Sequence, residues 1–362
     1  MRLLIINFEA DELSGVLAWQ LKIAKLLAAR CEAVVVLTEK RGQVGQLPAN
    51  LFIEEMAPSI GNMPTRVSRY LAVSLQARRL CRQHRIQACF IHMAHTWAYR
   101  LWPVLKGLAR IPVLTWYAHG SVSWGLKAAV ACSDRMITST PEGLRIDTSK
   151  KRIIGQGVDT ELFKPVPRSE QANQCLYVGR ISRRKQIDFI VDVAHALYQM
   201  DPASPITFGI AGPMLTLDDL AYDRTVQSKV WDLQLQNKIR FLGFVPQSHL
   251  PQLYDGTFLH LNLSRTGSLD KTILEALACD CPVLTTNEAT RSIFVDSPSN
   301  AEFKDFYCSQ TTADELARRI IDFHHQPHRF APGSIRALVA GRHDEQAFVN
   351  HVMHQLRELV PQ

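Results

Sequence analysis

Four cations follow a glycine in the segment "YVGRISRRKQIDFIVDVA" of the second half of the chain. A strand-like run ends at Gly179, and Arg180, Arg183, Arg184 and Lys185 lead into a helical pattern. Glycine lets backbone N–H groups approach a ligand closely, and cations at the start of a helix suit phosphate. The segment therefore predicts a phosphate site; a plain strand–turn–helix connection with solvated arginines is the alternative.

Two more strand-like runs in this half end in glycine. They are "FGIAGP", with Gly212, and "IRFLGFV", with Gly243. In a parallel sheet the carboxyl ends of the strands share one edge, where α/β proteins bind nucleotides. Three such strands beside a basic loop favour a nucleotide over an arbitrary anion.

The segment "SRTGSLDKTILEALACDCPVLTT" (264–286) combines a loop of small polar residues, an amphipathic helix and a strand-like run. Glu275 lies on the apolar side of that helix, beside Leu274 and Leu277. A carboxylate is costly to bury unless hydrogen bonds hold it. Its position therefore predicts a polar partner at this point of the fold.

The first half offers histidines and acids at the ends of strand-like runs. His119 follows one such run in "PVLTWYAHG", and His92 and His95 lie in "FIHMAHTW". A neutral imidazole there can hydrogen-bond a hydroxyl group, although structural histidines are common at such positions. Asp11 and Glu12, in the first loop, are candidate bases.

Strand-like and helical patterns alternate through most of the chain, which predicts two open domains with parallel sheets and crossover helices. The polar segment "VDTELFKPVPRSEQAN" interrupts the alternation near residue 165, as a linker would. The expected strands are at 3–7, 33–38, 87–92, 112–118, 135–140, 151–157, 174–180, 206–212, 238–244, 257–264 and 282–286, and the main expected helices are at 15–30, 64–84, 98–109, 186–199, 217–235, 312–325 and 344–359.

The net charge of +7 is unevenly distributed over the 362 residues. No Asp or Glu occurs from Met56 to Ser133. A surface on which all charges are positive favours an anionic partner such as nucleic acid, lipid headgroups or a phosphorylated substrate. The alternative is that these cations form a solvated helix face without a partner. The cations of this stretch are Arg66, Arg69, Arg78, Arg79, Arg82, Arg85, Arg100, Lys106, Arg110 and Lys127.

Several classes of protein are disfavoured. The sequence has no G-x-G-x-x-G fingerprint and no Asp-x-Asp pair, and "HHQPH" (324–328) lacks a carboxylate or cysteine partner for a metal. No helix-turn-helix, zinc-finger or RNA-binding pattern accompanies the basic stretch, so nucleic acid is not the expected partner. Without a signal peptide or an apolar run of about 18 residues, we expect a cytoplasmic protein, or one peripheral to the inner face of the membrane.

Short motifs across the chain resemble those of GT-B fold retaining glycosyltransferases of family 4 (glycosyl transferases group 1). That family carries "VGR…K", "FLG" and "LEA-A-G-PV" in this order, and here they stand as "VGRISRRK", "RFLGFV" and "LEALACDCPVL". "IIGQGVDTELFKP", "SGVLAWQLKIAKLLA" and "WYAHGSVSWG" are similar to its "NGVD…F-P" segment, its first-loop glycine motif and its His-Gly loop.

The resemblance implies an α/β fold of GT-B architecture, with two Rossmann-like parallel-sheet domains facing each other across a cleft. We expect an N-terminal acceptor-binding domain at 1–165 and a C-terminal nucleotide-sugar-binding domain at 166–340. A helix at 341–362 is expected to cross back to the first domain.

The resemblance also implies roles for residues. Glu275 is expected to bind the ribose of a nucleotide-sugar, Arg180 and Lys185 to bind its diphosphate, and His119 to contact the transferred sugar. The candidate catalytic residues are thus His119, Arg180 and Lys185, and the candidate acceptor-binding residues are Asp11, Glu12, His92 and His95. The candidate donor-binding residues are Gly15, Gly179, Arg180, Lys185, Gly212, Phe244, Val245, Gly267, Ser268, Asp270, Lys271, Leu274 and Glu275.

One position departs from the family's pattern. Many members carry a second glutamate eight positions before the one that corresponds to Glu275, and that position here is Gly267. Asp270 either takes over a sugar hydroxyl or complements the helix dipole as an N-terminal acid. Backbone N–H groups near Ser268 offer a further contact to sugar or phosphate.

The implied activity is transfer of a sugar, with retention of configuration, from a nucleotide diphosphate sugar to a glycan or lipid-linked acceptor of cell-envelope polysaccharide or glycolipid synthesis. No tightly bound cofactor and no obligatory divalent metal are expected, and an anionic membrane surface is a candidate partner of the basic stretch at 66–110. The alternatives are a nucleotide-sugar epimerase or phosphorylase, and a catalytically silent nucleotide-sugar-binding partner of another transferase.

Overall fold

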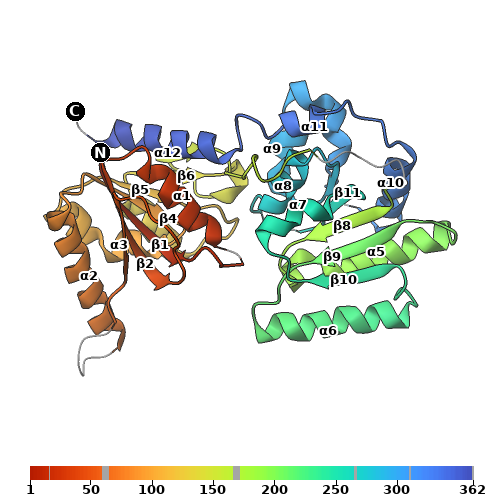
Figure 1. The fold of residues 1–362 in the computed structure, drawn as a ribbon, viewed down its shortest axis with the longest axis horizontal. Coiled ribbons are helices and arrows are strands. Elements are labelled where there is room, and N and C mark those ends of the chain that lie inside the picture. Colours follow the sequence, from red (N-terminus) through yellow and green to blue (C-terminus); the bar gives the residue numbers. More distant parts are fainter. Residues whose placement is uncertain (16, 59–64, 166–171, 265–266, 310, 361–362) are drawn as a thin grey trace. The chain divides into compact units, whose positions relative to one another are not determined.

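The chain forms two α/β units (Figure 1). The structure is a computed structural model that describes residues 1–15, 17–58, 65–165, 172–264, 267–309 and 311–360, with the backbone alone at 65 and 66. The first unit comprises Met1–Gly157 and Glu345–Gln362, and the second comprises Val158–Asp344.

The first unit contains a seven-stranded sheet, ordered β3-β2-β1-β4-β5-β6-β7, whose strands all pair in parallel. The six expected strands are present. The additional β3 is a short edge strand with alternating exposed residues, so its segment "LFIEE" lacks the continuous apolar run of a buried strand. The strands are β1 (Arg2–Ala10), β2 (Ala33–Arg41), β3 (Leu51–Glu55), β4 (Ala88–His92), β5 (Val113–Trp116), β6 (Arg135–Thr138) and β7 (Lys151–Ile153).

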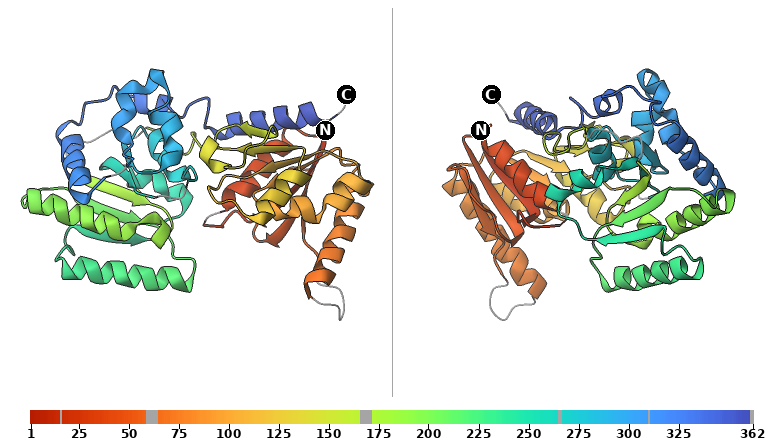
Figure 2. Two further views of the ribbon diagram at one scale, coloured as in Figure 1. Left: turned by 180° about the vertical axis from the view of Figure 1, so that it is seen from behind. Right: turned by 45° about the vertical axis from the view of Figure 1, so that its right-hand side comes forward.

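Helices cover both faces of this sheet (Figure 2). Successive side chains of a strand point to opposite faces. Leu3 and Ile5 accordingly lie in one core cluster with residues of α1 and α12, and Leu4 and Ile6 lie in another with residues of α2 and α3. The α-helices of this unit are α1 (Ala18–Ala28), α2 (Thr65–Gln83), α3 (Thr96–Arg100), α4 (Trp124–Cys132) and α12 (Glu345–Leu359).

The single helix expected at 98–109 is two shorter elements. Helix α3 ends at Arg100, and a π-helical segment follows at Pro103–Leu108. Pro103 has no N–H and its ring clashes with the preceding turn, so an α-helix does not continue through it.

The second unit contains a five-stranded parallel sheet, ordered β10-β9-β8-β11-β12. Helix α5 packs against α6 and α10, and α11 packs against α8. The strands are β8 (Gln174–Val178), β9 (Thr207–Ala211), β10 (Ile239–Gly243), β11 (Thr257–Asn262) and β12 (Val283–Thr285). The α-helices are α5 (Ile187–Met200), α6 (Leu217–Asp232), α7 (Leu250–Leu253), α8 (Lys271–Ala278), α9 (Arg291–Phe294), α10 (Ala313–His325) and α11 (Ser334–Ala337).

The boundary between the units lies after Gly157, not at the expected residue 165. Val158 and Phe163 are fully buried in the core of the second unit. The Arg336 side chain donates hydrogen bonds to the carbonyls of Thr160 (2.8 Å) and Phe163 (2.7 Å). These contacts make 158–165 part of the second unit, although its prolines and polar residues are typical of a linker; residues 166–171 lie outside the described part of the chain.

The last helix belongs to the first unit, whereas residues 341–344 of the segment expected at 341–362 belong to the second. It begins at Glu345 and packs against α1. The Phe348 ring meets Trp116 edge to face, with ring centroids 5.0 Å apart. Arg30 reaches the same helix through hydrogen bonds to Asn350 (3.1 Å) and Gln346 (2.5 Å).

Substituting Phe348 by Ala tests this packing. The change empties a fully buried site, so we expect the free energy of unfolding of the first unit to fall by about 3–5 kcal/mol. His354→Ala is the matched control on the same helix, because its side chain is 66% exposed; its effect is expected to stay within about 0.5 kcal/mol. Thermal unfolding measures both, and an equally small effect of the two substitutions would contradict this role of α12.

Candidate active site

Three glycines lie side by side at the carboxyl edge of the second sheet. The Gly179 N–H donates to the Ala211 carbonyl (2.9 Å), and the Gly212 N–H donates to the Gly243 carbonyl (2.8 Å). A Cβ atom on Gly212, whose φ is +151°, would lie 1.8 Å from the Gly179 carbonyl oxygen. No other residue fits this approach, so the glycines bring β8, β9 and β10 together at one edge, as predicted.

Arg180 follows the first of these glycines and is held by α6. Its Nε donates to Asp219 Oδ2 at 2.7 Å. Asp219 also accepts the N–H groups of Leu215 (2.9 Å) and Thr216 (3.1 Å), and it forms a capping box with Thr216. Burial raises the pKa of Asp219, but the hydrogen bond from Arg180 and the backbone donors outweigh it and leave the pKa below its ordinary value.

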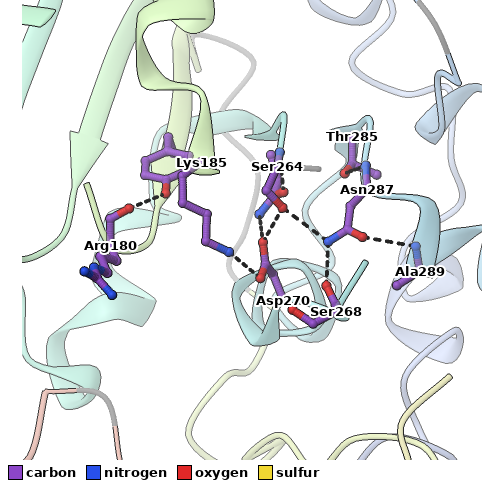
Figure 3. Close-up of polar contacts among 10 residues, drawn as sticks. Arg180, Lys185, Ser264, Ser268, Asp270, Thr285, Asn287 and Ala289 are labelled. Carbon is purple, nitrogen blue, oxygen red and sulfur yellow. Dashed lines mark hydrogen bonds and ion pairs between the residues drawn. The ribbon is translucent and has the colours of Figure 1, made fainter. Parts of the chain in front are cut away.

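Lys185 is paired with Asp270 (Figure 3). Lys185 lies in a short 3₁₀ turn before α5, and its Nζ lies 2.5 Å from Asp270 Oδ1. The second carboxylate oxygen accepts hydrogen bonds from Ser264 Oγ (2.7 Å) and Asn262 Nδ2 (3.0 Å). Burial raises the Asp270 pKa, but Lys185 and these donors bring it below its ordinary value. The stability that such a group contributes is present above its ordinary pKa and is lost as the pH falls through the lowered pKa.

Asn287 holds the loop before α8 against β12 (Figure 3). Its Nδ2 donates to the Ser268 carbonyl (2.8 Å) and to Ser264 Oγ (3.3 Å), and its Oδ1 accepts the Ala289 N–H (3.0 Å). One connected polar network therefore joins the loop after β8, the end of β11, the start of α8 and the loop after β12.

Glu275 is buried on α8, with an exposed fraction of 3%. Its Oε1 accepts a hydrogen bond from Gln247 Nε2 (3.1 Å), so the fold itself supplies a polar partner for the buried carboxylate. Burial raises the pKa of Tyr254, and the negative charge of Glu275 raises it further. Because Gln247 lies in the loop after β10, this bond connects α8 to the loop that carries Phe244 and Val245.

The other candidate donor residues differ in what they offer a ligand. Phe244 is 51% exposed, whereas the Leu274 side chain is fully buried and can reach a ligand only through its backbone. Gly267 has a φ of +66°, and Lys271 is the first residue of α8. Val245 packs partly against the core of the second unit.

In the first unit, Tyr117 brings two candidate histidines together. Its ring lies 4.9 Å from that of His95 and 5.5 Å from that of His119, in edge-to-face contacts. Burial lowers the His95 pKa, which favours the neutral imidazole. The His119 side chain is exposed, and the backbone N–H of His119 donates to the Gly143 carbonyl (2.9 Å).

His92 is a core histidine, which corrects the prediction that it lines the acceptor side. Its exposed fraction is 0%, and its ring lies 4.4 Å from the Trp19 ring and 5.2 Å from that of Phe90. The side chain at the last position of β4 faces the cluster beneath α1 and α12. A strand-end histidine in the sequence does not reveal which face of the sheet it takes.

The first loop holds its acids in local contacts. Asp11 Oδ1 accepts the N–H groups of Leu13 (2.9 Å) and Gln43 (3.2 Å), and Glu12 forms an ion pair with Lys25. Gly15 is exposed in the same loop. These three candidates therefore belong to the first unit, together with His95 and His119.

No group of three or more His, Cys, Asp or Glu side chains within the described ranges is arranged to hold a metal ion. In the "HHQPH" segment, His324 Nε2 lies 2.7 Å from Asn173 Oδ1. Across the same part of the chain, no helix has the length and apolar character that crossing a bilayer requires.

Several contributors to the site were not predicted from the sequence. Asp219 could have been suspected, because "TLDD" (216–219) has the spacing of a capping box. Gln247, Asn262 and Asn287 give no such signal, since each meets its partner only through the tertiary fold.

Comparison with known proteins extends these observations. Residues 158–333 match the family model described as "Glycosyl transferases group 1". The chain is similar to mannosylfructose-phosphate synthase of Agrobacterium fabrum (25% identical over 170 residues, 42% of this chain and 37% of that protein). It is also similar to D-inositol 3-phosphate glycosyltransferase of Corynebacterium jeikeium (23% over 288 residues, 76% and 68%). The solved structure of Anabaena HepE in complex with UDP superposes with a TM-score of 0.78 at 16% identity, covering 99% of this chain and 100% of that one.

The two parallel-sheet units and this structural likeness define the fold as GT-B, with two Rossmann-like units in one chain. Its second unit carries the match to the glycosyl transferases group 1 family, which agrees with the predicted family. The predicted fold class is confirmed. The similarity to the first of these curated proteins spans only 37% of that protein's length.

A double-mutant cycle tests the Lys185–Asp270 pair. Asp270→Ala leaves a mostly buried ammonium without its counter-charge, so we expect the free energy of unfolding to fall by about 3 kcal/mol. The Lys185→Ala/Asp270→Ala variant is expected to lose clearly less than the sum of the single losses. The same cycle at the exposed pair Lys164–Glu161 is the control, with coupling below about 1 kcal/mol. Additive losses at Lys185 and Asp270 in thermal unfolding would contradict the proposed coupling.

Proposed function

We propose that this chain transfers a sugar from a nucleotide diphosphate sugar to a glycan or lipid-linked acceptor, with retention of configuration, in cell-envelope polysaccharide or glycolipid synthesis. The donor binds the second unit and the acceptor binds the first. The observation that carries the proposal is the polar edge of the second sheet, where three glycine-ended strands, two cations and the buried Glu275 come from neighbouring elements.

Each part of this edge suits one part of the donor. Gly179 and Gly212 end their strands without a side chain of their own between the backbone and a ligand. Glu275 is a buried acceptor for ribose hydroxyls, and the exposed ring of Phe244 lies in the loop that Gln247 ties to it. We place the base beside that loop.

Arg180 and Lys185 bind the diphosphate in this proposal. Both are held by carboxylates, but a guanidinium has five N–H donors and an ammonium has three, so each keeps donors beyond its ion pair. The carboxylates fix the position of both cations before the donor arrives. Fixed cations stabilise the charge that develops on the departing diphosphate without reorganising during the reaction.

A leaving diphosphate oxygen can accept the proton of the attacking acceptor hydroxyl on the same face of the sugar. No protein nucleophile is then needed, which is compatible with Gly267. We assign His119 to a hydrogen bond with the transferred sugar and Asp270 to holding Lys185. Anabaena HepE has been solved with UDP-glucose, which makes UDP-sugars the first donors to test here.

The acid-free stretch gives α2 a face suited to an anionic membrane. Val67, Leu71 and Leu75 recur every four residues and are 43–55% exposed, and Arg78 and Arg82 follow on the same side. A hollow of about 460 Å³ is lined by Leu75, Arg78, Arg79, Arg82 and Gln83.

Acids outside the stretch pair with two of its cations. Arg79 binds Glu54, and Lys106 binds Asp134. The charge of the stretch is therefore partly compensated, which its sequence alone does not show. The side chain of Arg66 lies outside the described part of the chain.

Donor binding is tested by thermal shift with UDP-, GDP- and ADP-sugars. We expect one nucleotide class to raise the melting temperature, because a ligand at 100 times its Kd stabilises by about 2.7 kcal/mol. Glu275→Gln and Arg180→Ala are expected to abolish the shift, whereas Arg184→Ala, an exposed cation in the same loop, is expected to keep it. A shift that survives Glu275→Gln and Arg180→Ala would contradict the donor site. Isomerised donor formed without acceptor would indicate an epimerase instead.

Vesicle sedimentation tests the membrane face. We expect binding to phosphatidylcholine vesicles that contain phosphatidylglycerol, weakening as salt rises. Each basic residue contributes about 1 kcal/mol at such a surface, so Arg78→Glu/Arg82→Glu is expected to reduce binding by about tenfold or more. Arg224→Glu, an exposed position of the second unit, is the control. Binding that ignores anionic lipid, or that both variants reduce equally, would contradict the proposal.

A further inference from the structure

Trp124 is unusually exposed for its residue type. It is the first residue of α4, and 75% of its surface is exposed, compared with 67% for Trp231 and 46% for Trp102. A large aromatic ring left in water at a fixed helical position is typical of a contact surface for a ligand or partner.

Tyr99 forms a pair with this tryptophan. The two ring centroids lie 5.6 Å apart, with their planes at 70°. The space beside Gly125 is open, because a Cβ placed there would meet nothing nearer than the Ser123 and Tyr99 hydroxyls at 3.8 Å. Helices α3 and α4 thus present two aromatic rings around an uncrowded backbone.

Two cations of the acid-free stretch flank the aromatic pair. The Arg100 guanidinium lies 6.0 Å from the Tyr99 ring centroid, and its side chain is exposed. Lys127 is exposed and lies three residues after Trp124, which places it on the same side of α4. The charge of this surface therefore suits a phosphate group.

The surface is continuous with the histidine cluster of the first unit. Ser123 caps α4 by accepting the Leu126 N–H (3.1 Å), and the Tyr117 hydroxyl donates to the Ser121 carbonyl (2.7 Å). The five-residue connection from His119 to Ser123 therefore runs from the Tyr117 cluster directly to Trp124. Trp124 therefore follows His119, the proposed sugar contact, by only five positions along this connection.

We propose that Tyr99 and Trp124 form the platform on which the acceptor's sugar ring stacks, and that Arg100 and Lys127 bind a phosphate carried by that sugar. This deepens the proposed function and rests on it. The aliphatic C–H face of a pyranose packs on an aromatic face, and guanidinium and ammonium groups bind phosphate oxygens. The phosphate belongs either to a soluble sugar phosphate or to a lipid diphosphate that carries the sugar.

Binding to the full-length protein tests the platform, with glucose 6-phosphate, glucose and a polyprenyl-diphosphate-linked glucose in detergent micelles as probes in saturation-transfer NMR. We expect at least one phosphorylated probe to bind more tightly than glucose. Trp124→Ala is expected to weaken that binding by about tenfold, and Trp124→Phe to restore most of it. Arg100→Ala/Lys127→Ala is expected to remove the preference over glucose.

Trp231→Ala, an exposed tryptophan of the second unit, is the matched control and is expected to change nothing. Binding of glucose 6-phosphate would identify a soluble acceptor, and binding of the micellar probe alone a lipid-linked one; both support the platform. Failure of all probes to bind, or binding that Trp124→Ala leaves unchanged, would overturn it. The nucleotide-sugar is expected to raise the melting temperature of the wild-type protein and of every platform variant. If it fails to do so in the wild-type protein, the proposed function is wrong, independently of the platform.

Discussion

The ion pair between Lys185 and Asp270 is the interaction on which the candidate site depends. It joins the loop after β8 to the start of α8, and the second oxygen of the carboxylate is held by Asn262 and Ser264. A mostly buried ammonium and carboxylate are tolerated only when each satisfies the other and the remaining lone pairs are hydrogen-bonded. The pair therefore fixes a cation at the sheet edge and keeps the segments around it in register.

The glycines determine where that cation lies. Because Gly212 approaches the Gly179 carbonyl so closely, β8 and β9 end together, and Arg180 leaves the sheet next to the 3₁₀ turn that carries Lys185. On the other side of α8, Gln247 holds Glu275. The site thus combines a glycine-lined backbone edge with polar groups already oriented by neighbours.

The sequence allowed the architecture and the glycine-ended edge of the second sheet to be predicted, because both depend on local signals; the roles of the donor-binding residues stay predictions. Alternating patterns, glycines at strand ends and an acid on an apolar helix face each have one straightforward physical interpretation. Contacts made over long sequence distances were not predictable. Asp219 and Asp270 pair with the two cations only in the fold, His92 turns into the core, and 158–165 packs into the second unit although its composition is that of a linker.

Hydrogen–deuterium exchange with and without UDP tests the central claim most directly, namely that the polar edge of the second sheet is the nucleotide site. The account predicts slower exchange at 179–187, at 243–249 and at 268–278 when UDP is bound. It predicts no change in β1, β2 and β3 of the first unit. Unchanged exchange in all three segments of the second unit, in the presence of saturating UDP that demonstrably binds, would contradict it.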